Sequence, residues 1–214
     1  MTDDHAPRTV WTIGHSTHSS AEFIALLQQA GIGVLVDVRH FPGSRRLPHF
    51  NREVLRARLA AAGLGYVHLV DLGGRREARA DSPNRVWRSA AFRGYADHME
   101  TAPFHAGIAA VVDLAGSARP ALMCAEGKWC DCHRSLIADH LKAAGHRVLH
   151  IQPGGGIEEH PYTAAARIVA GRLSYAGGRR GEVGQLEVDF TGSPGGSPPS
   201  TPPSPPPGAA SEHH

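Results

Sequence analysis

Residues 124–134 hold all three cysteines of this 214-residue chain, together with several groups that ionise or bind anions. The segment reads Cys-Ala-Glu-Gly-Lys-Trp-Cys-Asp-Cys-His-Arg. Thiols, a carboxylate, an imidazole and a guanidinium this close together can support nucleophilic or redox thiol chemistry, or metal coordination. Three cysteines cannot form an even disulfide framework, so we expect reduced thiols that serve metal binding, redox chemistry or catalysis.

Cys132 is the expected nucleophile or redox thiol of this segment. An apolar strand leads into Cys124, and residues 135–145 have helical spacing, so the motif lies on a strand-to-helix turn. With Asp131 as the helix N-cap, Cys132 falls in the first helical turn beside Arg134. Unpaired amides, the helix dipole and the guanidinium at that position all favour the thiolate.

The other groups of the segment have supporting roles in this hypothesis. Cys124 is the resolving or supporting thiol, and Glu126 or His133 transfers protons. Structural interpretations stay open, since small buried cysteines often fill space and Glu126 could be a solvated turn carboxylate. A cysteine phosphatase is not indicated, because Arg134 follows Cys124 by ten residues, too far for the cysteine and arginine of a phosphate-cradling loop.

Metal binding is the alternative for the same segment. Cys124, Cys130, Cys132 and His133 are nominal ligands for zinc or iron. The spacing argues against this set, since structural zinc sites typically use cysteine pairs separated by about two to four residues. In addition, adjacent Cys132 and His133 on a helix would point in different directions. No motif therefore implies a cofactor, and zinc or iron remains the alternative.

Arginine dominates the positive charge of the chain, because 20 of its 22 basic residues are arginine. Twelve of these lie between Arg39 and Arg93, and over residues 37–93 only five acidic residues oppose them. Arginine suits bidentate contact with phosphate. A GC-rich coding bias would equally explain the choice of arginine over lysine, but it does not explain the local excess of positive charge.

Strand and helix signals alternate along the chain. Apolar runs predict strands over residues 9–13, 32–39, 66–70, 121–124 and 146–151. Helical spacing and capping residues predict helices over residues 19–31, 52–62, 104–115, 135–145 and 162–173, with an irregular charged stretch over 79–94. This alternation predicts a three-layer α/β fold with a mostly parallel sheet of about five strands flanked by helices.

Four polar loops each follow a predicted strand, so all four should open at the carboxyl edge of the sheet and face one crevice. They contain residues 15–16, 37–46, 73–76 and 124–134. Their ligand-binding candidates are polar or cationic residues, and glycines that permit close backbone approach: His15, Ser16, Asp37, Arg39, Ser44, Arg45, Gly73, Gly74 and Arg134. A scaffold role for the histidine and a loop-shaping ion pair between the aspartate and its neighbouring arginine stay open.

The chain length fits one domain, which we expect over residues 8–190. Residues 191–214 are rich in proline, glycine and serine and are expected to be a disordered tail. The first residues are polar and no run of about 18 apolar residues occurs, which predicts neither a signal peptide nor a membrane span. We therefore expect a cytoplasmic protein without a membrane partner; the sequence carries no signal for its oligomeric state.

Several short motifs together resemble a bacterial and archaeal family catalogued only as domain of unknown function 488. In chain order these motifs are Thr12-Ile-Gly-His-Ser16, Val36-Asp-Val-Arg39 with Pro42 and Ser44-Arg45, Leu72-Gly-Gly74, Cys124-x-Glu126 and Cys132-His-Arg134. No single motif is diagnostic, but their order over residues 8–165 is specific. The resemblance implies one small α/β domain and no particular activity. The family pattern includes Cys124 and Cys132 but not Cys130, so a three-thiolate site would be a local addition.

The thiols and the charge together predict a basic crevice that binds a phosphate-bearing small molecule or nucleic acid and acts on it through a thiol. The chain contains neither a Walker motif nor the Rossmann glycine fingerprint, so this hypothesis depends on arginines and helix ends. The competing hypothesis is a non-catalytic module, in which the arginines dock nucleic acid while the cysteines hold a metal or report the redox state.

Overall fold

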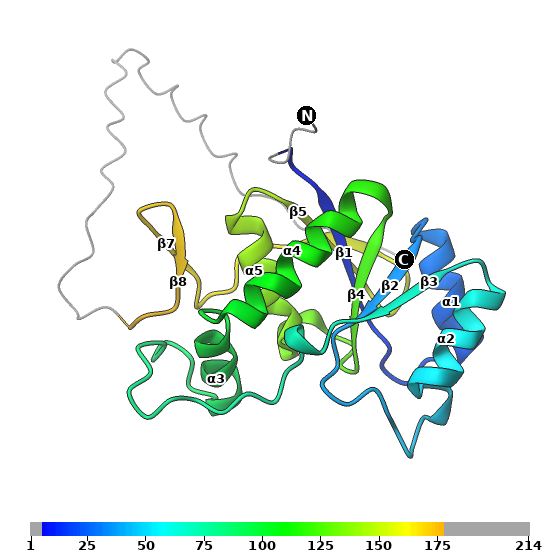
Figure 1. Ribbon diagram of the computed structural model, residues 1–214, viewed down its shortest axis with the longest axis horizontal. Helices are drawn as coiled ribbons and strands as arrows, with labels where there is room; N and C mark the ends of the chain where they lie inside the picture. Colours follow the sequence, from blue (N-terminus) through cyan, green and yellow to red (C-terminus); the bar gives the residue numbers. More distant parts are fainter. Residues whose placement is uncertain (1–5, 178–214) are drawn as a thin grey trace, which may run out of the picture. The chain divides into compact units, whose positions relative to one another are not determined.

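Six strands form the main sheet, in the order β3-β2-β4-β1-β5-β6. Their bounds are β1 (Thr9–Gly14), β2 (Val34–Asp37), β3 (Gly65–His68), β4 (Pro120–Cys124), β5 (Arg147–Ile151) and β6 (Ile157–Glu159). The first five run parallel, and β6 pairs antiparallel with β5. The computed structural model describes residues 6–177 (Figure 1). The predicted domain end at residue 190 and the predicted tail over 191–214 lie outside the described residues.

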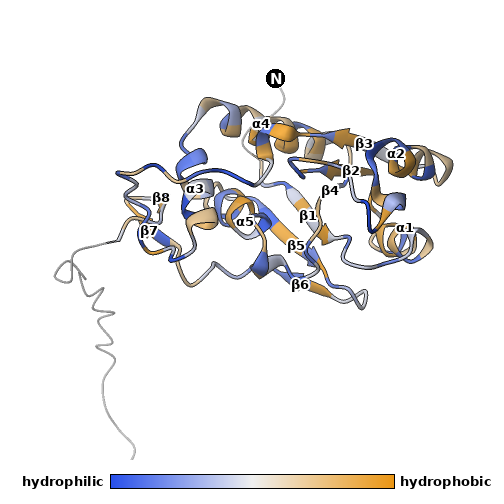
Figure 2. Ribbon diagram, turned by 90° about the horizontal axis from the view of Figure 1, so that it is seen from below, coloured by the Kyte–Doolittle hydropathy of each residue, from blue (hydrophilic) through white to orange (hydrophobic). Residues whose placement is uncertain are grey.

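Helices cover both faces of the sheet, which confirms the three-layer α/β prediction. The longer helices are α1 (Ser20–Gln29), α2 (Arg52–Ala61), α3 (Ala90–His98), α4 (Ala102–Ser117) and α5 (Arg134–Ala143). One core lies between the sheet and α1 and α2, and the other between the sheet and α3, α4 and α5. Neighbouring residues of β1, such as Val10 and Trp11, enter opposite cores, as the alternation of side chains along a strand requires. Figure 2 shows hydrophobic residues where strands and helices face each other.

Helix α1 illustrates how local sequence sets an element. The Ser19 hydroxyl accepts a hydrogen bond from the Glu22 amide at 3.2 Å, and the Glu22 carboxylate accepts one from the Ser19 amide at 2.8 Å. This is the capping box that the sequence predicts. Phe23 and Leu27 lie one turn apart and are fully buried, so they fix α1 against the sheet. None of the helices in the described part of the chain is long and apolar enough to cross a membrane.

The structure differs from the predicted elements at three places. The predicted helix over residues 162–173 is wrong, because its second half forms a hairpin of β7 (Arg167–Val169) and β8 (Arg172–Ser174). Ala170 and Gly171 have φ of 48° and 75°, the left-handed conformation of a tight hairpin turn, which a helix cannot accommodate. The stretch predicted as irregular contains the start of α3, and β6 extends the sheet by a strand that the sequence did not indicate.

The carboxyl ends of the parallel strands line up at one edge of the sheet. Gly14 pairs with Cys124, and Asp37 pairs with both Met123 and His68. The four predicted polar loops follow β1, β2, β3 and β4, the third after a short 3-10 helix, η2 (Val70–Leu72). All four therefore leave the sheet at the same edge, as expected.

Candidate functional site

A hollow of about 320 Å³ opens at this edge, and residues from all four loops line it. The sequence-predicted residues with polar, charged or thiol side chains that line it are His15, Arg39, Ser44, Cys124, Glu126 and His133. A smaller hollow of about 120 Å³ shares Gly74, Arg75, Glu126 and His133 with the first and adds Cys132. The structure thus brings most of the sequence-predicted site residues to one cleft.

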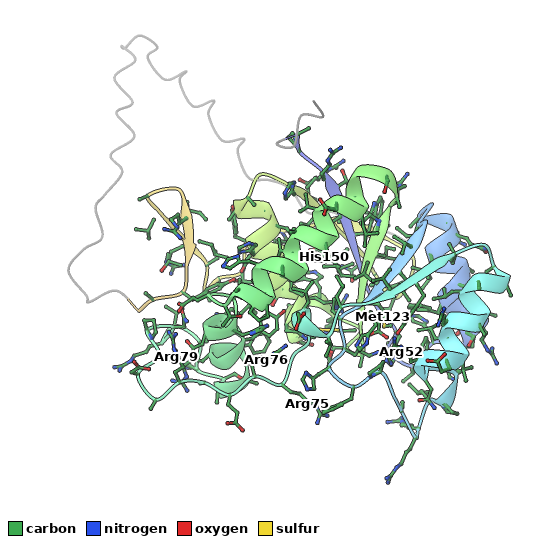
Figure 3. All side chains as sticks on the ribbon, in the orientation of Figure 1. Arg52, Arg75, Arg76, Arg79, Met123 and His150 are labelled. Carbon is green, nitrogen blue, oxygen red and sulfur yellow. A yellow bond between two sulfur atoms is a disulfide. The ribbon has the colours of Figure 1, made fainter. Side chains whose placement is uncertain are left out.

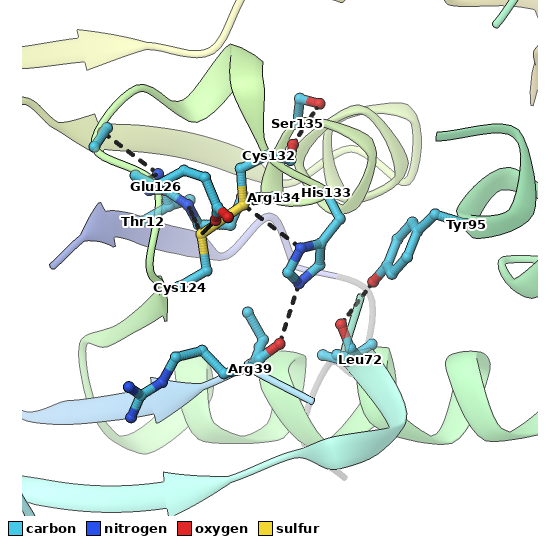
Figure 4. Close-up of a disulfide and its surroundings, with 12 residues drawn as sticks. Thr12, Arg39, Leu72, Tyr95, Cys124, Glu126, Cys132, His133, Arg134 and Ser135 are labelled. Carbon is cyan, nitrogen blue, oxygen red and sulfur yellow. Dashed lines mark hydrogen bonds between the residues drawn. A yellow bond between two sulfur atoms is a disulfide. The ribbon is translucent and has the colours of Figure 1, made fainter. Parts of the chain in front are cut away.

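The two buried cysteines of this cleft are paired. Cys124 ends β4 and Cys132 precedes α5, and the structure joins their sulfurs as a disulfide (Figure 4). For these two residues the structure therefore gives a neighbouring pair, whereas the sequence predicted separate reduced thiols. Cys130 is exposed and free. Because the strand end and the start of the next helix converge at one edge of the sheet, two cysteines eight residues apart become direct neighbours.

Arg134 lies behind Cys124 rather than in the cleft. Its side chain is 1% exposed, and its Nε donates to the Cys124 sulfur at 3.0 Å. Its Nη1 donates to Thr12 Oγ1 at 3.2 Å, and its Nη2 to the Glu126 carbonyl at 2.6 Å. Burial lowers the pKa of Arg134 to about 10, so the guanidinium still carries its charge at neutral pH. A buried cation therefore contacts the sulfur of Cys124.

Cys132 has a different neighbour, the imidazole of His133. Helix α5 begins at Arg134 and its N-cap is His133, so the prediction of Asp131 as the N-cap is wrong. Asp131 instead ends the 3-10 helix η3 (Trp129–Asp131), which places Cys132 before the helix rather than in its first turn. The Arg134 amide lies 3.5 Å from the Cys132 sulfur, so this sulfur still receives one donor from the helix end.

His133 is oriented as a proton acceptor for Cys132. Its Nε2 lies 3.1 Å from the Val38 carbonyl, and only a protonated Nε2 can donate to that oxygen. The unprotonated Nδ1 then faces the Cys132 sulfur at 3.5 Å. Burial lowers the pKa of His133 to about 4, which keeps the ring neutral at pH 7. The expectation that Cys132 and His133 point apart is wrong, because both residues precede the regular helix.

Glu126 is the exposed acidic group of the site. Its Oε2 lies 3.0 Å from the Cys124 sulfur, close enough to accept a thiol proton when the pair is reduced. The Glu126 backbone presses against β1, since a side chain at Gly14 would collide with the Glu126 carbonyl. Glycine at position 14 thus permits the loop to bring Glu126 next to Cys124.

Asp37 and Arg39 form the loop-shaping ion pair that the sequence left open. Asp37 accepts from Arg39 Nε at 2.9 Å and from Nη2 at 2.6 Å, and Nη2 also donates to the Phe50 carbonyl. Tyr66 completes the Asp37 contacts with a hydrogen bond of 2.8 Å. Figure 4 shows the Arg39 side chain directed away from the cysteine pair. The positive charge of Arg39 is therefore largely balanced by Asp37 within the protein.

The histidine after β1 has a scaffold environment. His15 is stacked on Phe50 at 4.2 Å between ring centroids, and its Nδ1 contacts the Ser16 carbonyl at 3.0 Å. Burial lowers the pKa of His15 to about 4, with Arg39 contributing in the same direction. Ser16 adopts a left-handed φ of 47°. A neutral His15 still lines the larger hollow, so it can contact a ligand without adding charge.

Some of the remaining predicted residues stabilise the loops around the cleft, and others pack against its lining. The Ser44 hydroxyl accepts from the Leu47 amide at 3.0 Å and stabilises its own loop. Arg45 is exposed and lines neither hollow at the cysteine pair. Gly73 and Gly74 have no room for a side chain, since Gly74 lies against the His133 ring. The glycines therefore let the third loop pack closely under His133.

Arg75, in the predicted polar loop over residues 73–76, is the cation that lines both hollows. Its side chain is exposed and stands 5.6 Å from the Phe41 ring (Figure 3). Within residues 6–177 it makes no ion pair and no side-chain hydrogen bond, whereas Arg76 beside it donates to Gly73 and Val70 carbonyls. Thr12 was missed, although a hydroxyl within an otherwise apolar strand was a visible signal.

The metal-ligand set proposed from the sequence is not assembled. Of Cys124, Cys130, Cys132 and His133, the exposed Cys130 lies apart, with its sulfur 3.7 Å from Asp131, because η3 turns it outward. Glu126 takes its place: donor atoms of Cys124, Glu126 and Cys132 lie within 4.8 Å of one another, the one such group in the described part of the chain. Two sulfurs and a carboxylate suit zinc or iron.

Comparisons with known proteins agree with the sequence motifs. A family model described as the domain of unknown function DUF488 matches residues 19–141. No curated protein matches the chain, and no solved structure matches it. The matched segment runs from the N-cap of α1 into α5 and contains the whole cysteine loop.

Proposed function

Because the chain belongs to the DUF488 family, whose name records no activity, we propose its function from the site: a thiol-dependent enzyme that acts on an anionic, phosphate-bearing ligand. The ligand is a nucleotide-like small molecule that itself carries a disulfide, and the reaction is thiol–disulfide exchange through Cys124 and Cys132. One observation carries this proposal. Two buried sulfurs pair at the floor of a cleft, and a buried guanidinium contacts one of them.

The surroundings of the two sulfurs assign their roles. Cys124 is the nucleophile, since Arg134 stabilises its thiolate and Glu126 lies in position to take its proton. Cys132 is the resolving thiol, since the neutral His133 accepts its proton when it attacks. These roles are the reverse of those predicted from the sequence, because the guanidinium of Arg134 contacts Cys124 rather than Cys132.

The proposed reaction balances in two steps. The Cys124 thiolate attacks a disulfide of the ligand, which breaks its sulfur–sulfur bond and releases one half as a thiol. The Cys132 thiolate then attacks the Cys124 sulfur, which releases the second half as a thiol and leaves the Cys124–Cys132 disulfide. Two electrons pass from the protein to the ligand. A thiol reductant, as the cytoplasm would supply, restores the two cysteines.

Anion binding in this proposal depends chiefly on Arg75. The other guanidinium groups close to the cleft are engaged: Arg39 with Asp37, Arg76 with backbone carbonyls, and Arg134 with Cys124. Arg75 lines both hollows, and its side chain makes no hydrogen bond or ion pair within residues 6–177. The ligand charge is therefore recognised at the rim of the cleft, above the sulfurs.

Trapping the mixed disulfide tests the roles of the two sulfurs. Oxidised glutathione, a small anionic disulfide, is added to the reduced full chain carrying Cys132→Ser, and to a chain carrying Cys124→Ser. Trypsin cleavage after Lys128 separates Cys124 from the other two cysteines for mass spectrometry. We expect glutathione to accumulate on Cys124 in the first variant and to react slowly with Cys132 in the second. Equal, slow reaction of both residues would refute the proposal.

The metal site is a second candidate, supported by the grouping of Cys124, Glu126 and Cys132. The residues fit zinc or iron in type, but the Arg134 guanidinium contacts one of the sulfurs, and its positive charge opposes a cation there. Elemental analysis of the purified chain separates the candidates. Stoichiometric zinc or iron, with thiols that react only after chelation, would replace the enzyme proposal by the metal module.

A further inference from the structure

A continuous chain of buried hydrogen bonds leads from Arg134 away from the cleft. Arg134 Nη1 contacts Thr12 Oγ1 at 3.2 Å, and the same oxygen lies 2.7 Å from His150 Nδ1. His150 Nε2 lies 2.9 Å from His160 Nδ1, and His160 Nε2 lies 2.9 Å from Asp139 Oδ1. All five side chains are at most 1% exposed. The reaction proposed above uses none of the last four groups.

The two ends of this series of hydrogen bonds fix the direction of their own bonds. Arg134 can only donate, so the Thr12 hydroxyl accepts from it. Asp139 as a carboxylate can only accept, so His160 donates to it from Nε2. With both imidazole rings neutral, the Thr12 hydroxyl donates to His150 Nδ1, and His150 Nε2 donates to His160 Nδ1. Burial and the neighbouring His160 and Arg134 lower the pKa of His150, which is consistent with a neutral ring.

Asp139 accepts several hydrogen bonds at the far end of this series. It accepts two bonds from Thr163, from the amide at 2.9 Å and from the hydroxyl at 2.6 Å. Tyr175 adds a third donor at 2.8 Å. With His160, four donors converge on one buried side chain. This series of hydrogen bonds therefore connects the Arg134 guanidinium to the Asp139 carboxylate through Thr12 and the two histidines.

The fold places these groups together from three regions. Thr12 and His150 are register partners on the adjacent strands β1 and β5, and both face the α5 side of the sheet. Arg134 and Asp139 lie on α5 itself. The series of hydrogen bonds therefore begins at this helix, crosses two strands and ends at the same helix. Trp129 of the cysteine loop stacks on His150 at 4.6 Å with an interplanar angle of 8° and shields it (Figure 3 labels His150).

We propose that Thr12, His150, His160 and Asp139 form a positioning relay, which holds the Arg134 guanidinium against Cys124 and so stabilises the reduced state of the cysteine pair. This inference rests on the proposed dithiol function. Arg134 has several N–H donors, and only Nε donates to the Cys124 sulfur. The hydrogen bond from Nη1 to Thr12 fixes the orientation of the guanidinium plane that directs Nε at this sulfur. The carboxylate of Asp139 strengthens that bond, since hydrogen bonds in a chain polarise one another.

The relay makes a prediction for the redox equilibrium of the cysteine pair. Thr12→Val keeps the shape of the side chain but removes the hydroxyl between Arg134 and His150. Loss of this hydrogen bond should destabilise the reduced form and shift the equilibrium with glutathione toward the disulfide by roughly fivefold. Thr12→Ser retains the hydroxyl and should restore the equilibrium of the unaltered chain. His146→Gln, which changes a histidine outside the relay, is the control.

The equilibrium is measured on the full chain by mass spectrometry of the cysteine peptides, with thermal unfolding to check that each variant is folded. Asp139→Asn is the second variant, because it removes the charge at the far end and should shift the equilibrium in the same direction as Thr12→Val. Equal equilibria in both variants and the unaltered chain would overturn the relay. Failure of the unaltered chain to form the Cys124–Cys132 disulfide at all would instead overturn the proposed function.

Discussion

Arg39 and Arg134 are both almost fully buried, at 7% and 1% exposure, but their charges are balanced in different ways. Arg39 forms a two-bond ion pair with Asp37. Arg134 has no carboxylate within ion-pair distance in the described part of the chain, and its contacts are a sulfur, a hydroxyl and backbone carbonyls. A buried cation without a counter-ion is costly, and a Cys124 thiolate would remove that cost. Arg39 therefore shapes the loop beside the cleft, whereas Arg134 is placed to stabilise a Cys124 thiolate in the proposed reaction.

The largest expected effect is on the free energy of unfolding and comes from breaking the Asp37–Arg39 ion pair. Asp37→Asn keeps the shape of the side chain but leaves the Arg39 charge buried and unpaired, which should lower the free energy of unfolding by about 3 kcal/mol. Denaturant unfolding measures it. Glu53→Gln is the matched control, because its pair with Arg52 is exposed and should contribute nothing measurable. Equal stability of the two variants would show that the Asp37–Arg39 pair does not hold the loop.

At the Arg134 side we expect a chemical rather than a mainly structural effect. Arg134→Met removes the charged donor from Cys124, so the reduced pair should lose stability relative to the disulfide by roughly tenfold or more in equilibrium constant. Equilibration with glutathione buffers measures this change. An unchanged redox equilibrium, in a variant that still folds, would mean that the guanidinium only fills space behind the sulfur.

His15 and His133, the two histidines of the cleft with lowered pKa values, predict a pH dependence of stability. The pKa of His133 and of His15 falls to about 4 in the folded chain, mainly through burial, from about 6.5 in the unfolded chain. The unfolded state therefore binds more protons between these values, and stability should fall as the pH drops from about 6.5 to about 4. His133→Gln should flatten this dependence in thermal unfolding across that range. A dependence of the same steepness would show that His133 is not held neutral by the fold.

Arg75 carries the smallest predicted effect, on affinity alone. Arg75→Ala should weaken the binding of inorganic phosphate or a nucleotide severalfold and reduce its dependence on salt, because one guanidinium is lost. Arg45→Ala is the control, since Arg45 is exposed but lies outside both hollows. Isothermal titration at two salt concentrations measures both variants. If Arg45→Ala weakens binding as much, the positive charge acts diffusely rather than through a site at Arg75.

The sequence predicted the parallel sheet because buried strands and capped helices have short-range signals. The capping box at Ser19 and the apolar runs of β1 to β5 needed no information from distant residues. The helix predicted over residues 162–173 failed because Ala170 and Gly171 form a turn that helical spacing cannot reveal. Packing, not local preference, decides such short segments.

The site was predicted in its location but not in its internal contacts. Strand-end loops brought Cys124, Cys132 and His133 together as expected, because parallel strands share an edge. Which arginine pairs with which partner depends on side-chain directions that the sequence does not contain. Arg134 therefore appeared as a ligand contact although it lies behind a sulfur, and the link from Thr12 to His150 became visible only once β1 and β5 were adjacent.

A redox titration of the unaltered full chain tests the central claim, that Cys124 and Cys132 form a reversible dithiol pair. The chain is equilibrated with glutathione buffers, and the Cys124–Cys132 peptide pair is quantified by mass spectrometry after cleavage at Lys128. We expect reversible formation of this disulfide alone, with a potential above about −300 mV, the range of catalytic rather than structural disulfides. A bridge that stays oxidised below that potential, or the absence of a Cys124–Cys132 bridge at every buffer ratio, would contradict it.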